Sequence, residues 1–379
     1  MSNISFSSVN ELKVLLKEKN LQKILLICGE NSFEASGASK ILKDLLKKKE
    51  LKIFKKKFSY PELNELDQII EILKDFSPDL ILAVGGGSVI DYAKTANVLT
   101  ESKNLKNEIL NSNYEIKKKF TKLAVIPTTA GSGAEVTANA VIYIDKVKYS
   151  VEGNFLRPDF FFLIPELVIT GSNKIKSSAG FDAIAQAIES LISKKSNDKS
   201  VSFAKQSLEI SFKNYLNYLN NPNIENTSAM CFAANLAGEA ISISKTTAPH
   251  AVSYPFTSIY GVSHGHAVSL TLNKFLKFNY ANMKDANCNF DLKERFKIIF
   301  DVAKLNNIND FDKFLDNLKS KAKLENNFKN LGIDIKNDYS KIISGVNMLR
   351  LSNNPIELNS SDLKKIIIDR SLWFFTNLS

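Results

Sequence analysis

Short apolar runs alternate with amphipathic helical patterns through the first 165 residues, and this alternation constrains the fold more than any other feature. The apolar runs lie at 23–29, 79–84 and 122–126, the segment 51–58 is also strand-like, and helical patterns at 34–48, 61–75 and 88–99 separate these segments. Strands that are separated by helices usually pair in parallel, with helices on both faces of the sheet. The sequence therefore predicts an α/β domain with a parallel sheet.

The second half of the chain has a different period. A hairpin is expected at 139–145 and 148–151 around Lys146-Val147, and beyond Pro165 the apolar spacing becomes helical, with long patterns at 201–219, 228–244 and 363–375. We place the boundary between residues 178 and 179. The predicted domains are 1–178, which is α/β, and 179–379, which is all-α.

Glycine-rich segments follow the predicted strands. Gly85-Gly86-Gly87-Ser88 ends one strand and opens a helix, residues 128–133 (TTAGSG) follow another strand, and Gly29 ends the first. Glycines let backbone N–H groups approach a phosphate, and a helix N-terminus favours its negative charge. A single glycine-rich turn is usually only a turn, but several at the strand ends of one parallel sheet favour a dinucleotide. The spacing is not GxGxxG, which indicates a nucleotide-binding design other than the ordinary Rossmann fold.

All three histidines, His250, His264 and His266, lie within 17 residues. A lone histidine is more often a core or capping residue, but three together favour one site for metal binding or proton transfer. The turn-prone segment 260–263 separates His250 from His264, so we expect two helices aimed at one point. Asp182 and Gln186 stand four residues apart on one helical face. Asp182 alone would suit a helix N-terminus, but with the histidine segment it indicates a shared metal site.

Composition excludes several classes of protein. The net charge is +10, yet only four of the 50 basic residues are arginine and no nucleic-acid motif accompanies the lysines, so we expect solvated lysine faces and no nucleic-acid partner. Cys28, Cys231 and Cys288 have no CxxC spacing, which argues against a disulfide framework or a structural zinc site. No signal sequence or membrane span is recognised, and we expect a cytoplasmic protein without a membrane partner.

Four motifs resemble the iron-containing, or group III, alcohol dehydrogenases. They are GGGSVID at 85–91, PTTAGSGAE at 127–135, AGFDAIAQAIE at 179–189 and APH…SHGHA at 248–267. The resemblance implies the dehydroquinate synthase-like fold of that family, NADP or NAD as the coenzyme, and a divalent metal, Fe or Zn. It implies nucleotide contacts at Gly29, Asn31, Ser32, Gly85, Gly86, Gly87, Ser88, Asp91, Thr128, Thr129, Ser132, Lys148 and Leu167.

The same resemblance gives the metal ligands. Asp182, His250 and His264 match three of the family's four, and Gln186 stands where the family usually has histidine. The histidine often found four residues after the first is here Tyr254. GENSF at 29–33, FDAIAQAIES and HGHAV are most similar to the phosphonoacetaldehyde reductase branch.

The implied activity is hydride transfer between NAD(P)H and a small aldehyde, with His266 or Tyr254 delivering the proton. His266 has a competing role in orienting His264. Arg350 and Asn353 would bind an anionic substrate, although a structural role for Arg350 is an equal alternative. The neutral Gly29 leaves room for the 2′-phosphate of NADPH.

Other functions remain open at this stage. A metal-free reductase or a lyase of the same superfamily would keep the nucleotide loops, and a basic nucleic-acid-binding protein is a more remote alternative. A homodimer is one assembly that the sequence allows.

Overall fold

The computed structural model describes residues 4–6, 8–18 and 21–368. Contacts divide the chain into two compact units, Met1–Lys176 with Asn221–Gly238, and Ser177–Asn220 with Glu239–Ser379. The predicted boundary at 178/179 lies two residues from the first change of unit. The sequence did not suggest that 221–238 would join the N-terminal part.

The first unit contains the expected parallel sheet, because every strand pair in it is parallel. Among the described residues the sheet has six strands in the order β1-β8-β5-β4-β2-β3. Their bounds are β1 Ile4–Phe6, β2 Lys23–Gly29, β3 Glu50–Lys56, β4 Leu80–Gly85, β5 Lys122–Pro127 and β8 Phe160–Phe162. The sequence analysis did not identify β1 and β8, which are three residues each.

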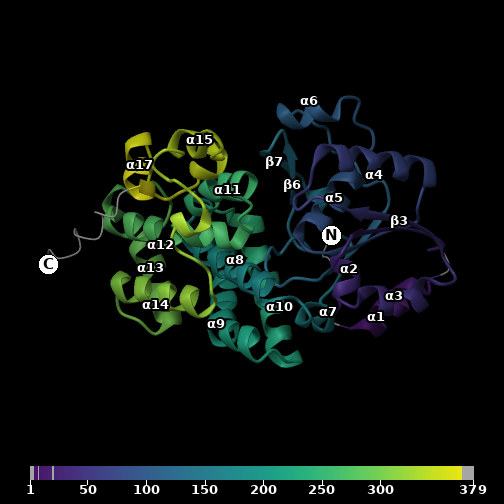
Figure 1. The fold of residues 1–379 in the computed structure, drawn as a ribbon, viewed down its shortest axis with the longest axis horizontal. Helices are drawn as coiled ribbons and strands as arrows, with labels where there is room; N and C mark the ends of the chain where they lie inside the picture. Colours follow the sequence, from purple (N-terminus) through teal and green to yellow (C-terminus); the bar gives the residue numbers. More distant parts are fainter. Residues whose placement is uncertain (1–3, 7, 19–20, 369–379) are drawn as a thin grey trace. The chain divides into compact units, whose positions relative to one another are not determined.

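Helices cover both faces of this sheet (Figure 1). Alternate residues of β2 point to opposite sides, as a pleated strand requires. Leu25 and Ile27 belong to the core beneath α4 (Leu63–Phe76) and α5 (Gly87–Val98). Ile24 and Leu26 belong to the core beneath α1 (Val9–Leu16), α2 (Ser32–Ala35), α3 (Ala38–Leu46) and α7 (Pro165–Ile169). The apolar runs at 23–29, 79–84 and 122–126 are therefore strands buried on both faces, whereas β3, at the edge of the sheet, is mostly exposed.

Two local predictions needed correction. The helix expected at 34–48 is broken into α2 and α3, because Gly37 adopts a left-handed conformation with φ of 80°. The hairpin of β6 (Asn139–Ile144) and β7 (Val147–Glu152) turns at Asp145 and Lys146, one residue earlier than expected. Both turn residues have positive φ, 51° and 66°, the conformation that a two-residue hairpin loop requires. The short α6 (Leu105–Leu110) and a 3-10 turn, Asn154–Leu156, complete this part.

The later half of the chain is helical, as predicted. Its helices are α8 Asn173–Ile192, α9 Asp198–Asn220, α10 Ile224–Ser244, α11 Ala248–Tyr260, α12 His264–Ala281, α13 Leu292–Ala303, α14 Ile308–Lys321, α15 Tyr339–Ser344, α16 Met348–Leu351 and α17 Ser360–Ile368, with 3-10 turns at Met283–Asp285 and Lys329–Leu331. The helix expected at 363–375 corresponds to α17, and its last part lies outside the described residues. A core that includes Phe256, Phe275 and Ile366 joins α11, α12 and α17. No helix in the described ranges is both long and apolar enough to cross a bilayer.

Candidate functional site

The glycine-rich segments meet at one edge of the sheet. Gly85 pairs in register with Pro127, and Cys28 pairs with Val84, so β2, β4 and β5 end together. After β2 the chain continues to β3 on one side, whereas after β4 it continues to β5 on the other. Ligands of open α/β sheets bind outside the strand ends at such a switch of direction. The predicted nucleotide segments therefore lie where the topology favours a nucleotide.

Two of these segments pack directly on each other. A Cβ atom added to Gly87 would lie 2.8 Å from Oγ of Ser132, and one added to Gly86 would lie 3.4 Å from Oγ1 of Thr129. The Thr128 N–H donates to the carbonyl of Gly85 at 3.0 Å. The first loop therefore needs glycine for contact with the second, in addition to any need for approach to a phosphate.

The N-terminus of α5 is suited to an anion. Its N-cap is Gly86, and no side-chain hydrogen bond caps it. The first N–H groups of a helix have no partner within the helix, and the helix dipole makes this end positive. The N–H groups of Gly87 and Ser88 are therefore placed to bind a phosphate.

A charged cluster lies beside this helix. Burial raises the pKa of the Asp91 carboxyl to about 6, against the opposing effect of Lys94 and Lys148 nearby. The Lys94 ammonium is fully buried and donates to the carbonyl of Ala134 and to Oγ1 of Thr137, at 3.0 and 2.9 Å. Asp91 and Lys148, predicted from separate parts of the sequence, are thus brought close together, while Lys94 anchors the chain that follows the second glycine-rich segment.

The remaining predicted nucleotide residues differ in exposure. Asn31 and Ser32 are exposed directly after β2. A Cβ on Gly29 would lie only 2.3 Å from Oγ of Ser32. The Leu167 side chain is 2% exposed and belongs to the hydrophobic core, so its side chain does not offer a surface to a nucleotide.

In the second unit, α8 presents Asp182 and Gln186 on one buried face, as their spacing predicted. One atom from each of Asp182, His250 and His264 forms a group in which all lie within 4.8 Å of one another. Nε2 of His250 is 3.3 Å from Oδ1 of Asp182, and Nε2 of His264 is 3.9 Å from the same oxygen. Histidine nitrogen and carboxylate oxygen are both ligands of divalent transition metals.

The expected turn brings the two histidines together. Gly261 ends α11 in a left-handed conformation with φ of 68°, and His264 begins α12. Gly265 then allows α12 to approach α8 closely, because a Cβ at this position would lie 2.0 Å from the carbonyl oxygen of Ser178 and 2.7 Å from Cβ of Asp182. Gly265 thus sets the distance between Asp182 on α8 and His264 on α12, which are two of the predicted ligands.

The ligand atoms present fit a metal. Nε2 of His250 is buried and has no hydrogen-bond partner among the described residues. Burial lowers the pKa of this imidazole, but the Glu189 and Asp182 carboxylates outweigh that effect and raise it to about 9. A divalent cation would be stabilised by the same two carboxylates, and it would satisfy the lone pair of Nε2.

Gln186 is turned toward the same group. Its amide nitrogen donates to Oδ2 of Asp182 at 3.1 Å. The amide oxygen is therefore the atom that could act as a fourth, neutral ligand. This interaction within the ligand set is consistent with a glutamine that orients Asp182 and lies next to the metal position.

Tyr254 contacts the predicted metal ligand His264, and Arg350 contacts Tyr254. The Tyr254 ring stacks on the His264 ring with centroids 5.8 Å apart. Burial raises the pKa of Tyr254 to about 12, and the Arg350 guanidinium, which hydrogen-bonds the phenol, partly offsets this. Arg350 is itself only 7% exposed. A positive charge is thus held one side chain away from His264.

Asn353, which the sequence analysis gave as a substrate-binding residue, is buried among protein hydrogen-bond partners. Its amide nitrogen donates to Oγ of Ser193 at 2.8 Å and to the carbonyls of Ser244 and Thr246, both at 2.9 Å. These bonds use the amide nitrogen to join the ends of α8 and α10 to the start of α11. Only its oxygen remains to contact a ligand, so the amide nitrogen serves packing.

His266 faces another part of the unit. Its Nε2 bonds the backbone carbonyl of Glu325 at 2.8 Å, and its backbone N–H donates to Oγ of Ser178 at 3.1 Å. The ring nitrogen must donate in the first bond, because a carbonyl only accepts. These contacts attach α12 to its neighbours, and His266 is not part of the metal-ligand group among the described residues.

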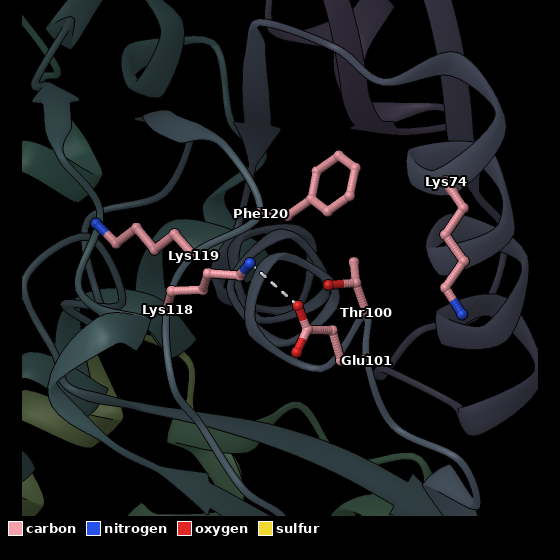
Figure 2. Close-up of a pocket in the computed structure, with 6 residues that line it drawn as sticks. All are labelled: Lys74, Thr100, Glu101, Lys118, Lys119 and Phe120. Carbon is pink, nitrogen blue, oxygen red and sulfur yellow. Dashed lines mark ion pairs between the residues drawn. The ribbon is translucent and has the colours of Figure 1, made fainter.

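A pocket of about 350 Å³ lies elsewhere in the first unit, lined by Lys74, Thr100, Glu101, Lys118, Lys119 and Phe120 (Figure 2). Residues 118–120 precede β5, so this pocket is at the opposite edge of the sheet from the glycine-rich segments. Lys118 pairs with Glu101 at 3.2 Å, and Lys119 pairs with Asp159 at 2.6 Å. It contains none of the predicted site residues.

Comparison with known families decides the identity of the chain. Residues 3–165 match the family model for iron-containing alcohol dehydrogenase, and residues 176–370 match the C-terminal model of the Fe-containing alcohol dehydrogenase family. The chain belongs to the iron-containing alcohol dehydrogenase family. The resemblance of the four motifs and the predicted fold are confirmed.

Individual relatives are distant. The chain is 26% identical to an NADPH-dependent butanol dehydrogenase of Clostridium saccharobutylicum, over 93% of this chain and 92% of that protein. It is 29% identical to a phosphonoacetaldehyde reductase of Streptomyces viridochromogenes, over 55% of each protein. It spans about a third, 32%, of the length of the aldehyde-alcohol dehydrogenase of Streptococcus pneumoniae.

Solved structures agree in fold. The sulfoacetaldehyde reductase of Bifidobacterium kashiwanohense, solved with NAD⁺, has a TM-score of 0.84 at 24% identity, with 96% of each chain covered. This likeness concerns the fold alone.

The sequence analysis did not identify Glu189 as a residue of the candidate metal site. Its carboxylate is fully buried against His250. The signal was present, because Glu189 follows Asp182 by seven residues and Gln186 by three, which places all three on one helical face. Without the position of α11, this spacing could not be told apart from that of an ordinary amphipathic helix.

Proposed function

We propose that this protein is a metal-dependent NAD(P)H-linked alcohol dehydrogenase that reduces a small anionic aldehyde. The observation that carries the proposal is the convergence of Asp182, His250 and His264 within 4.8 Å. Such a site suits carbonyl reduction by hydride, because a bound cation would stabilise the charge that develops on the oxygen as hydride reaches the carbon.

The metal would be held by Asp182, His250 and His264, with Gln186 as a neutral fourth ligand. When bound, such an ion polarises a carbonyl oxygen. Three strong ligands and one weak one suit an exchangeable ion with a position open to substrate. An iron or zinc ion fits nitrogen and oxygen ligands of this kind.

The coenzyme would be bound by the loops at the ends of β2, β4 and β5. The N–H groups of Gly87 and Ser88 at the start of α5 suit its pyrophosphate, and Thr128, Thr129 and Ser132 supply hydroxyl groups. The neutral Gly29 offers no carboxylate to repel a 2′-phosphate, so we propose that NADPH is accepted at least as well as NADH. The NADPH-dependent relative is consistent with this preference.

The anionic part of the substrate would interact with Arg350. This guanidinium is buried and bonded to Tyr254, whose ring stacks on His264. A buried arginine strongly favours carboxylate-like, phosphonate or sulfonate groups. The relative named for phosphonoacetaldehyde supports this substrate class, and we propose phosphonoacetaldehyde first.

Tyr254 would donate a hydrogen bond at the reacting oxygen. Its phenol is hydrogen-bonded to the Arg350 guanidinium, and its ring stacks on the ring of His264, a predicted metal ligand. His266, the first choice from the sequence, bonds the Glu325 carbonyl, so Tyr254 is better supported as the group near the oxygen.

The test is an aldehyde panel with NADPH and NADH, measured with metal-loaded protein, after chelation, and after addition of zinc or ferrous iron. We expect phosphonoacetaldehyde to exceed neutral aldehydes of the same length in kcat/KM, and activity to be lost on chelation and restored by metal. Full activity of metal-free protein would refute the electrophilic role. Better turnover of neutral short aldehydes would refute the substrate class.

Arg350→Lys separates the anion contact from the metal site. Lysine keeps the charge but loses the planar pair of donors, so we expect KM for phosphonoacetaldehyde to rise about tenfold while KM for a neutral aldehyde changes little. An equal change for both substrates would indicate a structural arginine.

A further inference from the structure

Glu189 occupies the buried face of α8 that also carries two of the predicted ligand residues. It follows Gln186 by three residues, close to one helical turn, and its side chain is fully buried. A buried carboxylate needs hydrogen-bond donors or a positive charge to compensate for lost solvation. The contacts of Glu189 therefore reveal what it does in this unit.

Those contacts are all at the N-terminus of α11. Oε1 accepts from the Thr247 N–H and hydroxyl, both at 2.9 Å, and from the His250 N–H at 3.3 Å. Oε2 contacts Nδ1 of the His250 ring. The Thr247 side chain does not cap its own helix. The Glu189 carboxylate, which comes from α8, therefore caps α11 and also contacts the His250 ring.

This arrangement determines which nitrogen of His250 faces the metal position. An ionised carboxylate can only accept a hydrogen bond, so Nδ1 carries the hydrogen. In the neutral imidazole, Nε2, which lies 3.3 Å from Oδ1 of Asp182, then presents its lone pair. The ring is held in the tautomer that a metal ligand requires.

We propose that Glu189 is a positioning residue that sets the metal affinity of the site by holding His250 in the Nδ1–H form. The inference rests on the proposed function, because it assumes that a metal binds at Asp182, His250 and His264. Gln186 supplies an amide where a stronger imidazole ligand is usual, so the site depends more heavily on the remaining histidines. A carboxylate bonded to Nδ1 raises the donor strength of the opposite nitrogen.

Asn353 helps to fix the position of Thr247 and His250 relative to Glu189. Its amide holds the carbonyl of Thr246 and the ends of α8 and α10, as described above. The neighbouring Thr247 therefore enters α11 at a fixed place relative to Glu189. The predicted substrate residue Asn353 thus contributes to the stability of the corner from which His250 projects.

Glu189→Gln is the sharpest test, because it keeps the shape of the side chain. The amide oxygen would stay at the Oε1 position, where it can accept from Thr247, and the NH₂ group would then occupy the Oε2 position. That group would donate to Nδ1 of His250 and move the ring hydrogen to Nε2, the wrong tautomer for the metal. We expect the zinc dissociation constant, measured by competition with a chelator, to rise about 10- to 100-fold.

Nuclear magnetic resonance gives a readout that packing alone would not change. Only three histidines are present, so ¹⁵N-histidine spectra of the metal-free protein, recorded with His250 in its neutral form, can be assigned. We expect His250 to carry its hydrogen on Nδ1 in the parent protein and to lose that signal in Glu189→Gln.

Two control variants separate the carboxylate from packing. Thr247→Val removes one hydroxyl contact of Glu189 and leaves the histidine pair, so zinc affinity should stay within about threefold. Glu189→Asp keeps a carboxylate, and we expect it to bind zinc more tightly than Glu189→Gln.

The proposal is overturned if Glu189→Gln binds zinc as the parent does, or if Glu189→Asp and Glu189→Gln are equally impaired while Nδ1 keeps its hydrogen in both. Failure of the proposed function looks different, because the parent protein itself would then bind no zinc.

Discussion

The two predicted sites of this protein use different parts of the chain. In the first unit the coenzyme segments are loops at strand ends, where backbone N–H groups and glycines matter most. In the second unit the predicted metal ligands are side chains on helices, and their neighbours are buried polar groups such as Glu189. We therefore expect the first site to be sensitive to any added side chain, and the second to be sensitive to the chemical identity of the side chains already there.

Removal of a shared ligand should have the largest effect. Asp182→Ala deletes the carboxylate that both histidines face, at 3.3 and 3.9 Å. Loss of several kcal/mol of transition-state stabilisation lowers kcat by about 10³-fold or more. Metal content, measured by mass spectrometry, should fall in parallel, while the dissociation constant for NADPH should remain within about threefold. Normal metal content in this variant would show that Asp182 is not a ligand.

Gly265→Ala tests the one place where the helical site also depends on a glycine. The new Cβ would lie 2.0 Å from the Ser178 carbonyl oxygen, so α12 must move away from α8. Overpacking of this kind costs about 1–3 kcal/mol, and zinc affinity should fall with the free energy of unfolding. Gly261→Ala is the control, because nothing lies within 4 Å of its Cβ position. It should lose about 1 kcal/mol from backbone strain alone, with a smaller change in zinc affinity.

Gly87→Ala and Gly86→Ala form a matched pair in the first unit. The added Cβ would lie 2.8 Å from Ser132 in the first variant, but 3.4 Å from Thr129 in the second. We expect KM for NADPH to rise about tenfold or more for Gly87→Ala, and less for Gly86→Ala. Zinc affinity should be unchanged in both. An equal rise would mean that approach of the phosphate, and not contact between the loops, is the limiting requirement.

Gln186→His should have the smallest effect on the metal site, and it should increase zinc affinity where the other variants of this site decrease it. Imidazole is a stronger ligand than an amide for late transition metals, so zinc should be retained about tenfold more tightly against a chelator. If retention does not increase, residue 186 does not face the metal position. Activity need not rise, because tighter binding of the ion does not by itself lower the barrier to hydride transfer.

The sequence predicted most of the fold because the central strands β2, β4 and β5 are continuously apolar and buried, and strongly periodic helices separate the strands. It failed where the local signal was short or was determined by packing. The three-residue strands β1 and β8 form edge pairs that only the rest of the sheet specifies. The break at Gly37 and the turn at Asp145 and Lys146 depend on left-handed conformations, which two of these three residue types rarely adopt.

The candidate site shows the same division. The spacing of Asp182 and Gln186 and the clustering of the histidines suggested a shared metal site. The structure brings Asp182, His250 and His264 into one group. The roles of Glu189 and Asn353 could not be predicted, because they depend on contacts between residues that are 61 and 109 positions apart in the sequence. His266 has the right residue type but faces Glu325.

Because Asp182, Gln186 and Glu189 share one face of α8, their separations are set by the pitch of a single helix. Insertion or deletion of one residue between 182 and 189 would rotate the rest of the helix by about 100°. Such a change would move at least one ligand or its support away from the histidines, however well the helix itself formed. The length of this stretch should therefore be nearly invariant in functional descendants of this protein, whereas the lysine-rich segment 101–119 can gain or lose residues.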